Sequence, residues 1–125
     1  MKSACIFPNS KGDSLILRFD EHPDLSLATM QRVLGNGVKS KIQIELLGQR
    51  SDGLSAYGDE DGKQHYKEVA GHVVWETLRV KLALLFQCPC PQVIGPILIT
   101  CTNLETGDEI SLTQDQCVSL QTIFN

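Results

Sequence analysis

Aromatic residues are scarce in this sequence, and no long apolar run is free of charge. Phe, Trp and Tyr make up only 6% of the 125 residues, which leaves few rings to act as stacking platforms for bases. The most apolar stretch, 73–86, contains Glu76, Arg79 and Lys81, and each charge is costly at the centre of a bilayer. The net charge of -4 also disfavours nucleic acid. We therefore expect neither nucleic acid nor a membrane as a partner.

Sequence signatures of catalysis and of cofactor binding are also missing. The chain contains no Gly-x-Ser-x-Gly elbow and no Gly-Lys-Ser/Thr phosphate loop. No residue stands out as catalytic, and we expect no cofactor and no bound metal. These absences favour a protein that is not an enzyme.

The cysteines indicate a reducing compartment. They are odd in number, and the apolar stretch after Lys2 is too short for a secretory signal because Pro8 and Asn9 interrupt it. We expect a cytoplasmic protein with free thiols. Cys88 and Cys90 have one residue between them, whereas zinc and thioredoxin-like pairs usually have two. We favour a helix end with small, half-buried thiols over a metal or redox site.

The bulk composition predicts one folded domain over 1–125. Hydrophobic residues make up 42% of the chain and charged residues 21%, which is enough apolar surface to build a core at this length. No repeat or linker divides the sequence.

Alternating apolar residues and turn formers predict several strands. Ile42, Ile44 and Leu46 alternate with charged and polar residues, as in a strand with one solvated face. The two opening runs, separated by turn formers, predict a hairpin. The predicted strands are 3–7, 14–19, 41–46, 54–57, 63–69, 93–102 and 109–112.

Three segments are predicted to be helical. A helix should begin at Pro23 and stop at Gly35, Asn36 and Gly37. The stretch 72–87 fits both the helical period and the strand period, and its length favours a helix. Because its other sides are apolar too, we expect this helix to be largely buried at the centre of the molecule.

The last helix should open at Thr113. Thr113 and Gln116 form a capping-box pattern, and Leu112 and Cys117 have the spacing of a hydrophobic staple. The predicted fold class is therefore α+β, with a mainly antiparallel sheet of about five strands against a central helix and two shorter helices.

The polar loop over 48–62 is the first candidate site. Loops on a rigid scaffold often carry recognition, and this one contains four acidic residues, Asp52, Asp59, Glu60 and Asp61. The leading hypothesis is a small acidic protein-interaction module of the inhibitor, immunity or accessory type. It would bind a protein partner or a second copy of itself as a homodimer.

The alternative hypothesis is a protein that responds to a small ligand or a metal. It would use a pocket between the central helix and the sheet, near Trp75 and the thiols of Cys88 and Cys90. This hypothesis requires the single tryptophan and the two thiols to lie close together in the fold.

Overall fold

A computed structural model describes residues 1–35 and 41–124. Over these residues the backbone forms a six-stranded sheet, four α-helices and one 3₁₀ turn. The strands are β1 (Lys2–Pro8), β2 (Leu15–Glu21), β3 (Ile44–Gln49), β4 (Leu54–Asp59), β5 (Ile97–Thr102) and β6 (Glu109–Ile110). The helical segments are α1 (Leu27–Leu34), α2 (Gly62–His65), η1 (Lys67–Val69), α3 (Val74–Phe86) and α4 (Gln114–Phe124).

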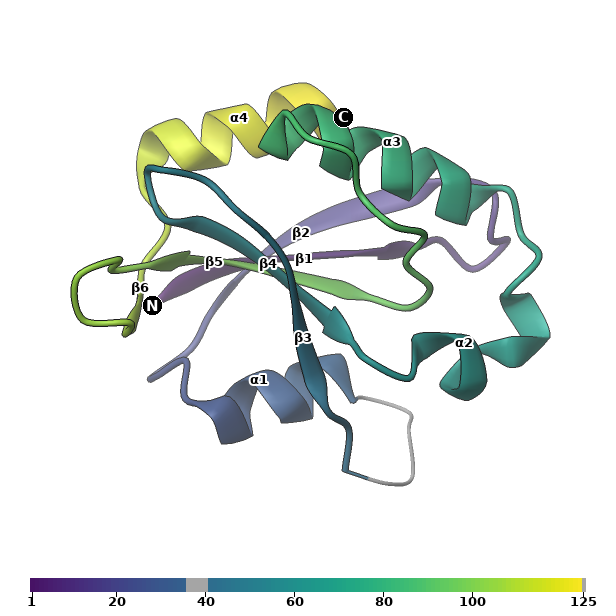
Figure 1. Ribbon diagram of the computed structural model, residues 1–125, viewed down its shortest axis with the longest axis horizontal. Coiled ribbons are helices and arrows are strands. Elements are labelled where there is room, and N and C mark those ends of the chain that lie inside the picture. Colours follow the sequence, from purple (N-terminus) through teal and green to yellow (C-terminus); the bar gives the residue numbers. More distant parts are fainter. Residues whose placement is uncertain (36–40, 125) are drawn as a thin grey trace.

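The sheet is antiparallel, and five of its strands follow the order β2-β1-β5-β4-β3, with β6 attached to β5. Figure 1 shows α3 and α4 on one face of the sheet and α1 on the other. The predicted α+β class and the opening hairpin are confirmed. Among the helices in the described residues, none is long and apolar enough to cross a membrane.

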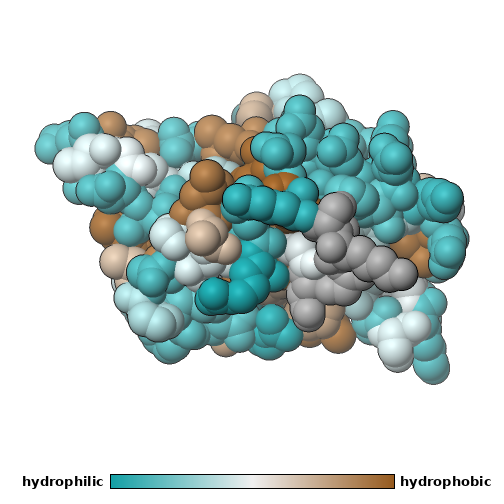
Figure 2. Space-filling model, turned by 90° about the horizontal axis from the view of Figure 1, so that it is seen from below, coloured by the Kyte–Doolittle hydropathy of each residue, from teal (hydrophilic) through white to brown (hydrophobic). Residues whose placement is uncertain are grey.

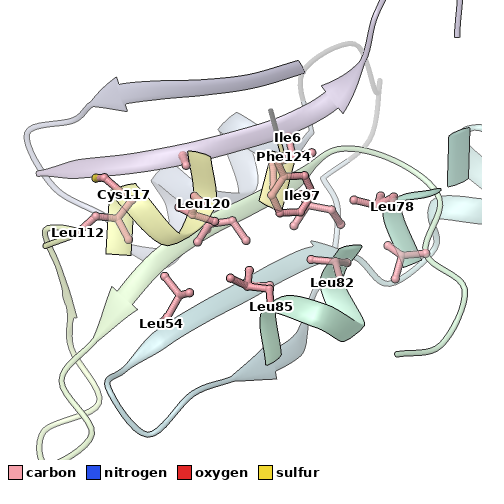
Figure 3. Close-up of a cluster of buried hydrophobic side chains, with 14 of the residues drawn as sticks. Ile6, Leu54, Leu78, Leu82, Leu85, Ile97, Leu112, Cys117, Leu120 and Phe124 are labelled. Carbon is pink, nitrogen blue, oxygen red and sulfur yellow. The ribbon is translucent and has the colours of Figure 1, made fainter. Parts of the chain in front are cut away.

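The main hydrophobic core lies between the sheet and the layer formed by α3 and α4 (Figure 3). Ile6, Leu54 and Ile97 are fully buried side chains from three neighbouring strands. Leu78 from α3 and Leu120 from α4 are also fully buried. Because successive strand residues point to opposite faces, only alternate positions reach this core.

Helix α4 begins as the sequence predicts. The Thr113 hydroxyl accepts a hydrogen bond from the Gln116 backbone N–H at 3.2 Å, and the Gln116 side chain accepts one from the Thr113 N–H at 2.9 Å. This reciprocal pair is a capping box. Leu112 and Cys117 are both buried in the main core, as the predicted hydrophobic staple requires.

Helix α1 begins four residues later than predicted. The start at Pro23 is wrong because Ser26 is the N-cap and its hydroxyl accepts a bond from the Thr29 N–H at 3.3 Å. The Asp24 carboxylate accepts bonds from the Ser26 N–H and the Thr29 hydroxyl, and these bonds lower the pKa of Asp24 to about 2. The helix therefore begins at Leu27, directly after this polar cap, and does not extend back to Pro23.

The end of α1 agrees with the sequence as far as it is described. The Gly35 N–H donates to the carbonyl oxygen of Gln31 at 2.8 Å. Asn36 and Gly37, the remainder of the predicted stop, lie outside the described residues. The Gln31 side chain also donates to the carbonyl oxygen of Ile42 at 3.0 Å, which ties the helix to the segment before β3.

The strand predicted over 41–46 lies three residues further along the chain, as β3. A β-bulge interrupts its pairing with β4 between Leu46 and Gly48. As a result Leu46 is half exposed, whereas Leu47 packs against the main core. Ile42 is fully buried, but it precedes the strand and packs in a small cluster under α1.

The strand predicted over 63–69 is wrong, because these residues form α2 and η1. Asp59 organises the turn that precedes them. One oxygen of its carboxylate accepts a bond from the Asp61 N–H at 2.9 Å, and the other lies 2.5 Å from His65 Nδ1. Such local bonds from an aspartate compete with strand pairing.

The sheet face toward α1 carries a row of polar side chains. In strand order from β2 to β3 the row is Asp20, Ser3, Thr100, Ser55 and Gln49. Ser3, Thr100 and Ser55 are fully buried. Figure 2 shows the molecule from this side, where hydrophilic and hydrophobic residues are mixed. The two faces of the sheet therefore differ, since the α3 and α4 side is apolar.

Glu109 in β6 gathers hydroxyl groups on this polar face. Its carboxylate accepts hydrogen bonds from Tyr57 at 2.5 Å, from Thr100 at 2.5 Å and from Thr102 at 3.0 Å. Burial and the bond to Glu109 raise the pKa of Tyr57. Because bonds to a charged acceptor are stronger than neutral ones, we regard this Glu109 network as a main tie between β4, β5 and β6.

Candidate functional site

Helix α3 packs against the sheet through one side only. Its buried residues are Val74, Trp75, Leu78, Leu82 and Leu85. They recur every three or four residues, so they share one side of the helix. The indole N–H of Trp75 donates to the carbonyl oxygen of Val69 at 2.7 Å, which anchors the start of α3. The helix predicted over 72–87 is confirmed.

The outer side of α3 is also apolar, although it faces solvent. Val73 is 80% exposed, Val80 43% and Leu84 63%. These residues and Thr77 are spaced by three or four positions, so they form one stripe along the helix. A helix that is apolar all round is normally buried on every side. The helix was predicted to be largely buried at the centre of the molecule, but the sheet and α4 leave this stripe uncovered.

Helix α4 provides a comparison within the same layer. Its exposed residues are Gln114, Asp115, Val118, Gln121 and Thr122, and only Val118 is a large apolar side chain. This is the polar outer side expected of a helix at a protein surface. The apolar outer side is therefore a property of α3 and not of the whole layer.

One edge of the α3 stripe carries an ion pair. The Arg79 guanidinium donates to the Glu76 carboxylate at 2.6 Å, across one turn of the helix. The bond to Arg79 lowers the pKa of Glu76, and the same bond raises the pKa of Arg79. Both side chains remain partly exposed, so they are available to a partner that covers the stripe.

A shallow hollow lies beside each end of α3. The hollow at the helix start has a volume of about 530 Å³ and is lined by Lys11 and Asp13 of the β1–β2 turn together with Val73. The hollow at the helix end has a volume of about 440 Å³ and is lined by Arg50 and Asp52 of the β3–β4 turn. We call the stripe, its ion pair and these two hollows the α3 surface.

Three of the four acidic residues of the predicted partner site lie together, and Asp52 is separate from them. Asp52 precedes β4 and Asp59 ends it, so about 20 Å of strand separates them. Asp59, Glu60 and Asp61 line a separate hollow of about 360 Å³, where the buried Asp59 is bonded to His65. Asp52 alone borders the α3 surface, where its carboxylate is paired with Arg50 at 2.5 Å.

The structure separates Trp75 from Cys88, one of the two thiols of the predicted ligand site. Trp75 lies in the first turn of α3 and Cys88 follows its last turn, which places them about 20 Å apart along the helix axis. Trp75 is almost completely buried. Cys88 is exposed and Cys90 partly buried, and burial raises the pKa of the Cys90 thiol. A raised pKa disfavours the thiolate that a metal or a redox reaction needs.

Metal binding has no further support in the described part of the chain. Within residues 1–35 and 41–124, no three His, Cys, Asp or Glu side chains are grouped so that they could hold a metal ion. All five cysteines are free thiols.

The sequence shows that the other sides of this helix are apolar, and this pattern led to the prediction of a central, largely buried helix. The number of predicted helices and strands already argues against complete cover for this helix. A helix that is apolar on every side needs cover on every side, and a domain with one sheet and two shorter helices cannot supply it.

Comparison of this chain with protein families, curated proteins and solved structures finds no match.

Proposed function

We propose that this protein is a non-enzymatic interaction module of the cytosol, and that it docks on another protein through the α3 surface. The observation that carries the proposal is the exposure of Val73, Val80 and Leu84 along one side of α3. Exposed apolar side chains that gather along one face of a domain are typical of protein interaction sites.

The arrangement around the stripe supports the same function. The centre is apolar, the Glu76–Arg79 ion pair lies along one edge of the stripe, and Asp52 lines the hollow at the end of the helix. An apolar centre with a polar rim is the usual anatomy of a protein interface. Of the four acidic residues, Asp52 lines a hollow at the end of α3, whereas Asp59, Glu60 and Asp61 line a different hollow.

Site-specific photo-cross-linking tests this proposal. The photoreactive residue p-benzoylphenylalanine replaces Leu84 in one variant and Val118 in a matched control. Both positions are exposed aliphatic residues on outer helix faces of the same layer, at 63% and 49% exposure. Irradiation in cells should give a protein adduct at position 84 and none above background at position 118. Equal adducts at both positions, or none at 84, would contradict the proposal.

A paired substitution tests the energetic role of the stripe. Leu84→Lys places a charge in the centre of the α3 surface, whereas Val118→Lys places the same charge on α4. Both variants should fold with nearly unchanged stability because both positions are exposed. Only Leu84→Lys should abolish binding of the partner that the position-84 cross-link identifies. Loss of capture in both variants would indicate a nonspecific effect of charge and would contradict the assignment.

A further inference from the structure

The α3 surface is electrically balanced, although the chain as a whole carries a net charge of -4. Its basic residues are Lys11, Arg50 and Arg79, and its acidic residues are Asp13, Asp52 and Glu76. The remaining charged residue of α3, Lys81, is directed toward α4, where it donates to the carbonyl oxygen of Ile123. The excess negative charge therefore lies on other parts of the molecule. Two copies of this chain can therefore bring their α3 surfaces together without electrostatic repulsion between surfaces of the same charge.

The stripe is arranged so that it can pack against itself. Most homodimers are two-fold symmetric, so that residue i of one copy contacts residue j of the other and the reverse. The centre of the stripe lies between Thr77 and Val80. If two α3 helices pack antiparallel about this point, Val73 of each copy faces Leu84 of the other. The two most exposed apolar residues of the stripe then cover each other.

The ion pair favours the same antiparallel arrangement. Glu76 and Arg79 lie along one edge of the stripe, and a two-fold antiparallel pair brings this edge against the same edge of the second helix. Each Glu76 then lies at nearly the height of Arg79 of the second copy, offset by about 3 Å along the axis. In a parallel pair this edge meets the opposite edge, so the two residues do not meet their counterparts.

We propose that two copies of this chain associate through the α3 surface as a two-fold symmetric, antiparallel pair of α3 helices. This inference rests on the proposed function, because it assumes that the α3 surface is a contact surface for protein. It names a second copy of the chain as the occupant.

The dimer is expected to be weak. From Val73 to Leu84 the stripe advances eleven residues along the helix, or about 17 Å at 1.5 Å per residue, and a helix is about 10 Å wide. Even with the two hollows added, the contact falls below the roughly 800 Å² per partner of a standard stable interface. We therefore expect a dissociation constant in the micromolar range and a clear dependence on protein concentration.

Sedimentation velocity between about 1 and 200 μM tests the association. The apparent mass should rise from the 13.8 kDa of one chain toward twice that value. Leu84→Lys should raise the dissociation constant at least tenfold, and the control Val118→Lys should leave it unchanged. A monomer at every concentration, or a dimer that is insensitive to Leu84→Lys, would overturn the inference.

A charge swap tests the antiparallel contact. Glu76→Arg alone brings two arginines together at each contact, and Arg79→Glu alone brings two glutamates together, so each should weaken the dimer about tenfold. The double variant Glu76→Arg/Arg79→Glu restores opposite charges and the wild-type net charge, and it should restore most of the affinity. A double variant that stays as weak as the single ones would exclude this register.

Cysteine pairing gives an independent measure of the register. In a Cys88→Ser/Cys90→Ser background, a mixture of Val73→Cys and Leu84→Cys proteins should form an intermolecular disulfide on mild oxidation. Each variant alone should form far less, because in an antiparallel pair neither position faces its own copy. Efficient self-cross-linking of the separate variants would indicate a parallel pair and would refute the proposal.

Failure of this inference is distinguishable from failure of the proposed function. A position-84 photo-adduct that contains a different protein, together with a monomer in sedimentation, overturns the homodimer and leaves the interaction module standing. Absence of any specific protein adduct at position 84 overturns both.

Discussion

Replacement of Tyr57 by Phe isolates one hydrogen bond of the Glu109 network. The substitution removes a hydroxyl that donates to the Glu109 carboxylate at 2.5 Å and leaves the ring in place. A hydrogen bond to a charged group contributes about 1.5–3 kcal/mol. Because Glu109 keeps its bonds from Thr100 and Thr102, we expect a loss of about 2 kcal/mol in the free energy of unfolding. At this chain length that loss lowers Tm by about 8 °C.

Tyr66 supplies a matched control for this experiment. Its ring is half-buried, and its hydroxyl is buried without a hydrogen-bond partner among the described residues. Tyr66→Phe should therefore leave the stability unchanged or raise it slightly. Urea unfolding followed by the fluorescence of the single tryptophan, Trp75, measures both variants. The reasoning is refuted if Tyr57→Phe destabilises the protein no more than Tyr66→Phe does.

Three further predictions concern the core, a helix cap and a close backbone contact. Burial raises the pKa of Cys5 from 9.0 to about 11, so the unfolded chain loses this proton first, and the free energy of unfolding should fall between pH 9 and 11 by up to about 3 kcal/mol. Urea titrations across that range should show this loss in the wild type and a smaller one in Cys5→Ala. Thr113→Ala removes the cap of α4 and should cost about 1 kcal/mol in thermal unfolding, whereas Thr113→Ser should not. Gly62→Ala places a Cβ against the carbonyl oxygen of Ile94 and should cost about 2 kcal/mol or more, while Gly71→Ala, with open space around it, should be tolerated in the same assay.

Local signals explain which elements of the fold could be predicted. The capping box at Thr113 and the apolar spacing along α3 depend on neighbouring residues, and both are confirmed. The strand expected over 63–69 failed because the side chain of Asp59 folds the turn before it, a contact that the apolar pattern does not record. The apolar pattern also does not record the β-bulge after Leu46, because the register of β3 depends on its partner strand β4.

The candidate site was predicted less well than the fold. The acidic residues were grouped by sequence distance, but the two ends of a strand lie far apart, so Asp52 and Asp59 lie at opposite ends of β4. The stripe of Val73, Val80 and Leu84 was recognised as apolar, but burial depends on what the rest of the chain packs against it. The spacing of apolar residues identifies the apolar faces of a helix, but it does not show whether other elements of the fold can cover those faces.

The polar row beneath α1 has a consequence for how the molecule opens. The row leaves α1 attached mainly through Met30, Leu34, Ile42 and Leu98, whereas α3 and α4 share the much larger core. Segments that bury few apolar contacts open at a lower free energy than the global transition. We therefore expect the amide hydrogens of α1 to exchange with solvent well before those of α3 and α4. Helix α1 would then detach from one face of the sheet and pack on it again, while the core on the opposite face stays folded.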